Sequence, residues 1–457
     1  MMRTKSVADL ARVVNRHLRR DGVTSSGVPA LTRLFESVYF ASLKTEEGKP
    51  LQVRVALVDP ADADPDPPPM PRSDRWKITK LASRLPLTVP NLVKLSKAAD
   101  PWSSCLAVFL DSGGEPFVWG LVDQTVHFNV QLVREAGGGG YAPPGLFQVF
   151  AAGAADLAVY REYGFVARLQ QDQLQTRQSD VFSKGPVRQR LSPGINRYLR
   201  AISRRLALMG TPDYLEEGEL QDSAEIWKSE LSEDWLSTLC RLLISIQRYR
   251  HGGALLITRV SRDLDIKYKI DYPRLSHALA SLAAQRIARM SIRDSLNMKY
   301  LEERKKFIPR SLYLDEMITG VYVDDHEDEI TGCVRFISSM SCVDGLILAS
   351  PDLSVRGFGV EIRTRKEVEK VYLSPGPVIS DKRLRRIDSS HYGTRHRTMM
   401  RFCFAHPGSI GFVISQDGEI RAMTRVKDRL VMWENLKVLH YWDFRPKKPQ
   451  SEKPKED

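Results

Sequence analysis

The apolar residues near the start of the chain recur with a helical period. Leu10, Val13, Val14 and His17 fall on one side of a helix drawn over the first twenty residues. Three short apolar runs that are typical of strands follow, CLAVFLD at 105–111, PFVWGLVD at 116–123 and LAVYR at 157–161. This order of elements predicts a small α/β domain over residues 1–180.

The pattern becomes helical in the middle of the chain. Residues 181–209 carry basic side chains at short intervals, and the acidic stretch YLEEGELQD at 214–222 follows them. The next helix, around 235–248, has an apolar stripe formed by Leu236, Leu239, Leu243 and Ile246. We therefore expect a basic and acidic helical linker at 181–234 and a further domain at 235–442.

The C-terminal half alternates strands with helices. The predicted strands are GALLITRV (253–260), DGLILAS (344–350), VRGFGVEIR (355–363), IGFVIS (410–415) and IRAMTR (420–425). One helix is marked by Leu275, Leu279 and Leu282, and another is predicted from about 394 to 405. Turns at Pro351-Asp352 and Asp417-Gly418 predict two hairpins. The fold class is therefore α/β, with a C-terminal mixed β-sheet flanked by helices, preceded by a smaller α/β domain and a helical linker.

Four segments fit neither period. The acidic, proline-rich residues 59–74 and the glycine-rich residues 137–145 are predicted to be exposed loops, and the latter lack the Lys-Ser/Thr of a phosphate-binding P-loop. The acidic run 324–329 is predicted to be a solvated loop inside an insertion. Residues 443–457 are predicted to be a disordered tail.

Composition limits the class of protein. The chain has 457 residues, of which 42% are hydrophobic and 27% charged, so it is expected to be globular rather than disordered. It has no secretory signal and no apolar run long enough to span a membrane, and its five cysteines form no CxxC pair. We therefore expect a cytoplasmic protein without disulfides or a zinc module.

The net charge of +12 indicates a polyanionic partner, either a nucleic acid or a nucleotide phosphate. Residues 181–212 contain seven basic and no acidic residues, which gives +7. Residues 382–401 contain seven basic residues and Asp388, which gives +6, so the rest of the chain has a net charge of −1. The basic excess is thus confined to two segments.

The second basic segment contains Gly393-Thr394-Arg395-His396-Arg397-Thr398 at the start of the predicted helix. Thr394 is predicted to cap this helix, whose first N–H groups then point outward. Cations are disfavoured at a helix N-terminus, so two arginines there indicate a bound anion between them. A solvated basic helix is the equal alternative from these residues alone.

Asp344-Gly345-Leu346 stands at the start of an apolar strand. A carboxylate beside a glycine that permits close backbone approach suits metal binding or activation of a hydroxyl. Asp-Gly is also a common turn, so this motif alone does not decide between the two interpretations.

Taken together, DGLILAS, GTRHRT and FVISQDGEIRAM are similar to the diadenylate cyclase domain, and RYRHGGALLIT at 248–258 resembles its opening strand. The family signatures are Asp-Gly-Ala and Arg-His-Arg, the latter preceded by Gly-Thr. The resemblance spans roughly 235–440. The region before it resembles the sensor-type domains that precede such cyclases, which makes 1–180 a sensor-like α/β domain.

The resemblance implies roles by position. Asp344, with Gly345 and Leu346, matches the catalytic motif that binds Mg²⁺ or Mn²⁺ and activates the ribose 3′-hydroxyl of ATP. Arg395, His396 and Arg397 match the triphosphate-binding signature, with Gly393, Thr394 and Thr398 beside it, and Ser415 and Gln416 match the strand end near the phosphates. Two such domains meet face to face as a dimer of the chain and condense two ATP into cyclic di-AMP and pyrophosphate.

Two alternatives stay open. Leu346 and Gln416 stand where the family usually has Ala and often has Glu, so the domain could bind nucleotides without turnover. The basic helix with Arg200, Arg204 and Arg205 could instead bind nucleic acid.

Overall fold

The computed structural model describes thirteen ranges of the chain. They are 4–20, 27–46, 48–62, 77–100, 103–123, 147–161, 164–212, 215–249, 251–260, 262–302, 307–365, 367–416 and 419–438. The predicted loop at 137–145, most of the one at 59–74, the turn Asp417-Gly418 and the tail 443–457 lie outside them. Within the described ranges, no helix could serve as a membrane span.

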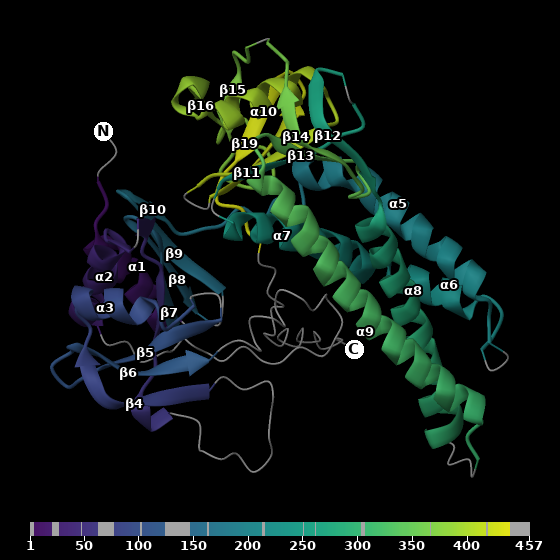
Figure 1. Ribbon diagram of the computed structural model, residues 1–457, viewed down its shortest axis with the longest axis horizontal. Helices are drawn as coiled ribbons and strands as arrows, with labels where there is room; N and C mark the ends of the chain where they lie inside the picture. Colours follow the sequence, from purple (N-terminus) through teal and green to yellow (C-terminus); the bar gives the residue numbers. More distant parts are fainter. Residues whose placement is uncertain are drawn as a thin grey trace, which may run out of the picture.

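The N-terminal unit is a mixed sheet covered by helices on one face (Figure 1). Its strands are β3 (Val53–Leu57), β4 (Lys77–Pro86), β5 (Ser104–Leu110), β6 (Pro116–Asp123), β7 (Phe147–Gly153), β8 (Asp156–Arg161), β9 (Gly164–Gln170) and β10 (Gln173–Gln175). Their order is β10-β9-β8-β7-β3-β5-β6-β4, in which only β3 and β5 run parallel among the described pairs. A small separate hairpin joins β1 (Thr45–Glu46) to β2 (Lys49–Pro50).

The helices of this unit in the described ranges are α1 (Val7–Arg20), α2 (Gly27–Ser42) and α3 (Val89–Ser96), with a short 3₁₀ turn η1 (Pro60–Asp62). In α1 the buried stripe contains Leu10 and Val14, as expected, but Leu18 completes it instead of His17. Leu18 is buried in place of His17 because burial of an aliphatic side chain gives a larger favourable free energy than burial of an imidazole. The three strands predicted at 105–123 and 157–161 are confirmed as β5, β6 and β8.

The C-terminal unit is built on a nine-stranded mixed sheet. Its strands are β11 (Gly253–Ile257), β12 (Leu264–Tyr272), β13 (Leu346–Ala349), β14 (Val355–Ile362), β15 (Val371–Leu373), β16 (Arg385–Ile387), β17 (Ile410–Ile414), β18 (Ile420–Val426) and β19 (Arg429–Trp433). Their order is β12-β14-β13-β11-β17-β18-β19-β15-β16. The two predicted hairpins, β13–β14 and β17–β18, are present as antiparallel pairs.

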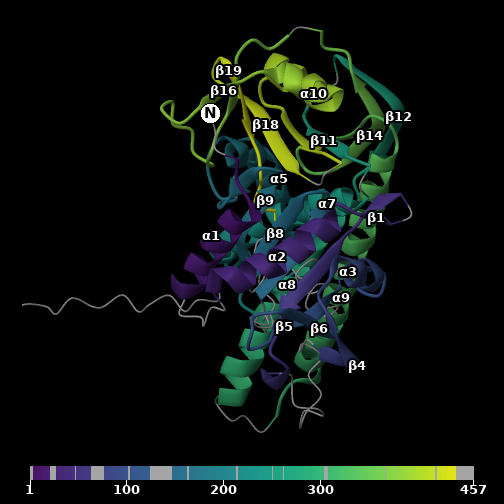
Figure 2. The ribbon, with the colours of Figure 1, turned by 90° about the vertical axis from the view of Figure 1, so that its left-hand side faces the viewer.

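Alternating residues of β11 belong to two different hydrophobic cores, because successive side chains of a strand point to opposite faces of the sheet. Ala254 and Leu256 face the core beneath α10 (Thr394–Ala405). Leu255 and Ile257 face the opposite core, which α5 (Pro186–Met209) and α7 (Lys228–Arg248) cover. The sheet is therefore sandwiched between helices, and Figure 2 shows α10 on one side of β11 and β18 with α5 and α7 below them.

The segment expected to be a linker is packed into this unit. Leu191, Ile195 and Ile202 of α5 belong to the same core as Leu255. A Cβ at Gly194 would collide with the backbone carbonyl of Pro351, so α5 lies directly against the β13–β14 turn. The short helix α6 (Glu219–Ile226) continues the same layer. The described buried apolar residues of 186–226 thus belong to the core of the C-terminal unit.

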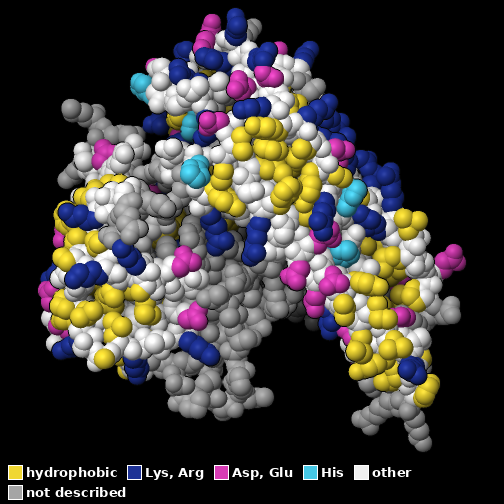
Figure 3. All heavy atoms as spheres, in the orientation of Figure 1, with side chains coloured by type: hydrophobic (Ala, Val, Ile, Leu, Met, Phe, Trp, Pro, Cys, Tyr) yellow, Lys and Arg dark blue, Asp and Glu magenta, His cyan; other side chains and the backbone are white. Residues whose placement is uncertain are grey.

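A long helical arm leaves the C-terminal sheet and returns to it. It consists of α8 (Arg274–Ser295), the π-helical turn η2 (Leu296–Glu302) and α9 (Arg310–Ser339), followed by the 3₁₀ turn η3 (Met340–Cys342). Figure 1 shows α8 and α9 side by side, projecting away from the sheet, and Figure 3 shows hydrophobic side chains on the outer surface of the arm.

The prediction of a solvated loop at 324–329 is wrong, because these residues lie within α9. Glu327 pairs with Arg286 at 2.7 Å and Glu329 pairs with Arg274 at 2.7 Å, both across to α8. The acidic run is thus one side of an interhelical charge ladder. The positive partners lie some fifty residues earlier in the chain, so the run by itself resembled a loop.

Candidate functional site

Three neighbouring strands have one of their ends at the same edge of the C-terminal sheet: β11 and β13 begin there, and β17 ends there. β11 runs parallel to β13, with Leu255 opposite Ile347, and antiparallel to β17, with Gly253 opposite Ile414. The first residues of β11 and β13 therefore lie beside the last residues of β17. This arrangement brings Gly252, Asp344 and Ser415 to one edge of the sheet.

The start of α10 closes over this edge. Gly252 has φ +64°, and a Cβ there would lie 2.9 Å from Nη1 of Arg395 and 3.2 Å from the carbonyl oxygen of Ile414. The same Cβ would lie 3.5 Å from Cγ of Gln416. The glycine leaves room for the guanidinium, so the opening strand, the Arg-His-Arg motif and the end of β17 meet at one point.

Thr394 does not cap α10, contrary to the prediction. The N-cap is Gly393, in an extended conformation, and no side chain accepts a hydrogen bond from the first turn. The carbonyl of Gly393 accepts the N–H groups of His396 and Arg397 at 3.0 and 3.2 Å. Thr394 is instead an exposed first residue of the helix. Without a side-chain cap, the positive end of the helix dipole faces the site.

Two guanidiniums at this helix end lack a negative partner. In the described part of the chain, the side chains of Arg395 and Arg397 form no hydrogen bond or ion pair, and Nε of Arg397 is buried without an acceptor. One turn further along α10, Arg401 pairs with Glu367. Unpaired, partly buried guanidiniums beside an uncapped helix start are suited to binding a phosphate group.

His396 is a buried residue of the same helical turn. Its side chain is buried, and its Nε2 accepts a hydrogen bond from Nη1 of Arg421 at 3.1 Å. The Tyr392 ring lies 5.7 Å from the imidazole, centroid to centroid. A guanidinium has only donors, so this bond fixes His396 Nε2 as the unprotonated nitrogen.

Arg421 on β18 is the centre of a buried charge network that the sequence pattern did not single out. It pairs with Glu419, and its Nε donates to Oε1 of Glu434 at 3.0 Å. Burial opposes the charge of Arg421, but the two carboxylates outweigh it and raise its pKa. Tyr392 completes the network by donating its hydroxyl to Oε1 of Glu434 at 3.1 Å.

The environment of Tyr392 keeps its hydroxyl protonated. Burial raises the pKa of Tyr392 above its ordinary value, and the charge of Glu434 adds to this rise. The signal for the network was present in the sequence, since Arg421 interrupts the apolar strand IRAM two residues after Glu419. A charge on a half-buried strand requires a partner.

Gly345 is required by the backbone. Its φ is +115°, and a Cβ there would lie 2.6 Å from the carbonyl carbon of Gly359 on β14. The predicted close approach is thus between two strands of the sheet. Asp344, just before it, is exposed. Leu346 is buried in the core beneath α10, so its bulk lies inside the sheet and not at the exposed edge beside Asp344.

The remaining motif residues shape the edge of the site. Ser415 donates its hydroxyl to the carbonyl of Glu419 at 3.1 Å, which closes the β17–β18 hairpin, and Gln416 is exposed beside it. Thr398 donates to the carbonyl of Arg395 at 3.2 Å and stays within its own helix. These three side chains lie at the edge of the candidate site and are uncharged.

The metal prediction rests on one carboxylate. No group of three or more His, Cys, Asp or Glu among the described residues could hold a metal ion. Asp344 is an oxygen donor of the kind that Mg²⁺ and Mn²⁺ prefer, and Mg²⁺ is commonly bound by one or two carboxylates together with substrate phosphates. The residues therefore fit an ion that arrives with the nucleotide.

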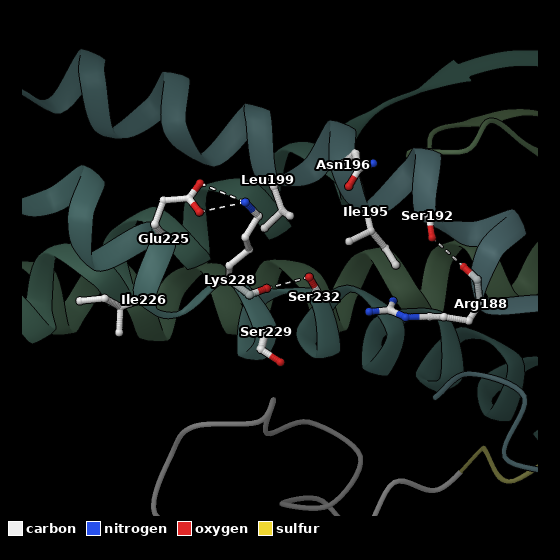
Figure 4. Close-up of a pocket in the computed structure, with 10 residues that line it drawn as sticks. All are labelled: Arg188, Ser192, Ile195, Asn196, Leu199, Glu225, Ile226, Lys228, Ser229 and Ser232. Atoms are coloured by element: carbon white, nitrogen blue, oxygen red, sulfur yellow. Dashed lines mark hydrogen bonds and ion pairs between the residues drawn. The ribbon is translucent and has the colours of Figure 1, made fainter. Parts of the chain in front are cut away.

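Other candidates from the sequence do not join this site. Burial raises the pKa of Cys403 to about 12, so this thiol packs as an apolar group, whereas Cys342 is exposed. A separate open cleft of about 530 Å³ lies between α5 and α6–α7 (Figure 4). Its Lys228 is already paired with Glu225 at 2.8 Å, and Arg188 with Glu233 at 3.7 Å.

The basic helix α5 uses part of its charge to hold the fold. Arg190 donates to the carbonyl of Arg425 at 3.0 Å, and Arg205 donates to the carbonyl of His277 at 3.1 Å. These contacts reduce the number of cations free to bind a nucleic acid.

Comparison with known proteins finds a match within the first unit. Residues 25–123 match the family model described as "Probable sensor domain DACNV", a stretch that contains α2, α3 and the strands β3 to β6. The prediction of an N-terminal sensor domain is thereby confirmed. No diadenylate cyclase domain family is detected, and no curated protein matches the chain. The fold is that of an α/β protein with two mixed sheets, and the first sheet includes strands of the stretch that matches the probable sensor domain.

Proposed function

We propose that the chain is a diadenylate cyclase whose activity is regulated by its N-terminal sensor domain. The observation that carries the proposal is the meeting of Asp344, Gly252 and Arg395 at one edge of the sheet, from three segments that each resemble a cyclase motif. The sensor match supports it independently, since domains of this family are found with diadenylate cyclases.

The geometry suits a reaction controlled by positioning and charge. The guanidiniums of Arg395 and Arg397 and the start of α10 would hold the triphosphate of ATP, with Asp344 across the strand ends near the ribose. In-line attack of a 3′-hydroxyl on the α-phosphate of a second ATP forms a phosphodiester bond and releases pyrophosphate. The arginines offset the charge that develops on the phosphate oxygens. Closing the ring requires two such attacks, and hence two chains face to face.

A divalent cation fits this scheme. Asp344 would hold Mg²⁺ or Mn²⁺ together with phosphate oxygens, and the ion would supply charge neutralisation and a more acidic 3′-hydroxyl. We expect the ion to bind with the nucleotide and only weakly to the protein alone.

The route for regulation is the segment that joins the two units, which contacts the end of β19. Asn435, just after β19, donates from Nδ2 to the carbonyl of Arg177 at 2.9 Å, and Ser179 pairs with Leu436 as an isolated bridge. The residue before Asn435 is Glu434, which holds Arg421. A displacement of the sensor domain would therefore be transmitted through Asn435 and Glu434 to Arg421, which donates a hydrogen bond to His396.

The decisive experiment is turnover of ATP by the full-length protein with Mn²⁺ or Mg²⁺, with the product identified by mass spectrometry. We expect cyclic di-AMP and pyrophosphate from the wild type and no product from Asp344→Asn, whose circular dichroism should be unchanged. Asp381→Asn, an exposed carboxylate outside the strand ends, is the matched control and should keep its activity. Absence of a cyclic dinucleotide with any nucleoside triphosphate, at saturating metal and protein, would refute the proposal.

A second candidate is a nucleotide sensor without turnover. Gln416 favours it, because an amide stands at the site where a carboxylate would assist the reaction in many members of the family. Calorimetry that shows tight ATP binding, together with no release of pyrophosphate, would select this function over the first.

A further inference from the structure

One side of α9 is apolar and faces solvent. We define the α9 stripe as six exposed hydrophobic residues in the first half of the helix, Tyr313, Leu314, Met317, Ile318, Val321 and Tyr322. Each leaves between 41% and 58% of its surface exposed. They recur at intervals of three and four residues, so they lie on one face of the helix. The opposite face of α9 already packs on α8 and α7.

The size of the stripe indicates an interface. Monomeric proteins rarely expose contiguous apolar patches larger than a few hundred square ångströms. The stripe presents roughly 600 Å² per copy, so two copies would bury about 1,200 Å², the lower end of the range for specific interfaces.

The spacing of the stripe has two-fold symmetry. A reversal of the helix about the midpoint between Met317 and Ile318 exchanges these two residues with each other. The same reversal exchanges Leu314 with Val321, and Tyr313 with Tyr322. An antiparallel second copy would therefore meet every apolar residue with another apolar residue. A self-complementary patch of this kind is what an isologous dimer requires.

The charges at the two ends of the stripe are complementary. Arg310 lies one turn before Leu314 and Asp325 lies one turn after Val321, on the same face of the helix. Both are exposed, and neither forms an ion pair within the described ranges. The same reversal that matches the apolar residues places Arg310 of each copy opposite Asp325 of the other.

We infer that two copies of this chain associate through antiparallel contact of their α9 stripes, with two Arg310–Asp325 ion pairs at the ends. This interface lies on the arm, outside the edge of the sheet that holds Asp344 and Arg395. It does not depend on nucleotide chemistry, and its failure would leave the proposed reaction intact.

The test is sedimentation velocity of the full-length protein over a concentration series without nucleotide. Leu314→Asp/Val321→Asp should abolish the association. Arg310→Glu and Asp325→Arg should each weaken it by roughly tenfold, since each places like charges opposite each other twice. The double variant Arg310→Glu/Asp325→Arg should restore the dissociation constant of the wild type. Equal dissociation constants for all variants, or no rescue by the double variant, would overturn the inference.

A disulfide cross-link tests the same contact even if the chains also associate through the face-to-face interface of the proposed reaction. In a Cys342→Ser background, Leu314→Cys/Val321→Cys should give a disulfide-linked dimer on mild oxidation. These two positions are seven residues apart on one helix and cannot bond within a chain. Leu314→Cys/Gly332→Cys, which is out of register, should stay monomeric on a non-reducing gel. Equal cross-linking of both pairs, or of neither, would contradict the antiparallel register.

Discussion

Nη1 of Arg421 donates a hydrogen bond to Nε2 of His396 over 3.1 Å, from a strand to the first turn of a helix. The imidazole thereby accepts a hydrogen bond from the sheet, in the same helical turn that carries Arg395 and Arg397. Under the proposed function, this bond would hold in place the turn that carries Arg395 and Arg397.

Arg421→Met should destabilise the protein strongly. The side chain is 15% exposed and pairs with Glu419 and Glu434, so its removal leaves two carboxylates without their cation. We expect a loss of about 3–5 kcal/mol in the free energy of unfolding, measured with urea. Arg421→Lys should lose less, because it keeps the charge. Equal stability of Arg421→Met and wild type would show that the network is not structural.

Arg395→Gln and Arg397→Gln should each raise the KM for ATP by about tenfold to a hundredfold, because each removes a charge-assisted hydrogen bond to the triphosphate. The unfolding midpoint should stay unchanged, since neither guanidinium has a partner in the described chain. Arg401→Gln on the same helix is the control, because Arg401 already pairs with Glu367. A similar rise in KM for Arg401→Gln would indicate a general charge effect.

Gly252→Ala should impair nucleotide binding. The new Cβ would displace the guanidinium of Arg395, and the left-handed φ of +64° adds about 1–2 kcal/mol of strain. Gly332→Ala is the matched control, because nothing lies within 4 Å of its Cβ position on α9. That variant should gain up to about 1 kcal/mol of stability and bind ATP as the wild type does. Tight ATP binding by Gly252→Ala would separate this glycine from the site.

The arm should lose stability in acid. Burial opposes the charge of Glu316, but hydrogen bonds from Arg293 and Arg289 outweigh it and hold the pKa below its ordinary value of 4.5. The hydrogen bond from Arg274 likewise lowers the pKa of Glu329. Since these pKa values are lower in the folded state, the stability is present above about pH 4.5 and is lost as the pH falls through the folded values.

The measurement is the thermal midpoint of wild type and Glu316→Gln between pH 7 and pH 3. The wild type should be the more stable at pH 7, and the difference should shrink as the pH falls. Two parallel curves would show that Glu316 adds no pH-dependent stability.

Local sequence patterns predicted the strands and α10 well. The apolar pattern of a buried strand or helix can be seen within its own segment, without knowledge of its neighbours in space. The run 253–260 and the two hairpins around Pro351 and Gly418 are examples. The meeting of Gly252, Asp344 and Ser415 could be expected only from the family resemblance, since the register of a parallel pair is set by a crossover of some ninety residues. For Arg421, the charge on a strand indicated a partner, but only Glu419 is near in the sequence, and Glu434 and His396 are 13 and 25 residues away.

The two ends of the arm meet at Tyr272, whose ring lies 5.0 Å from that of Phe336 and whose hydroxyl donates to Sγ of Cys333 at 3.3 Å. The chain therefore leaves and re-enters the sheet at almost the same place. The entropy of closing such an excursion grows only slowly with its length. The arm is in effect a spacer, and its reach can lengthen or shorten by whole turns while the strand ends that it connects keep their register.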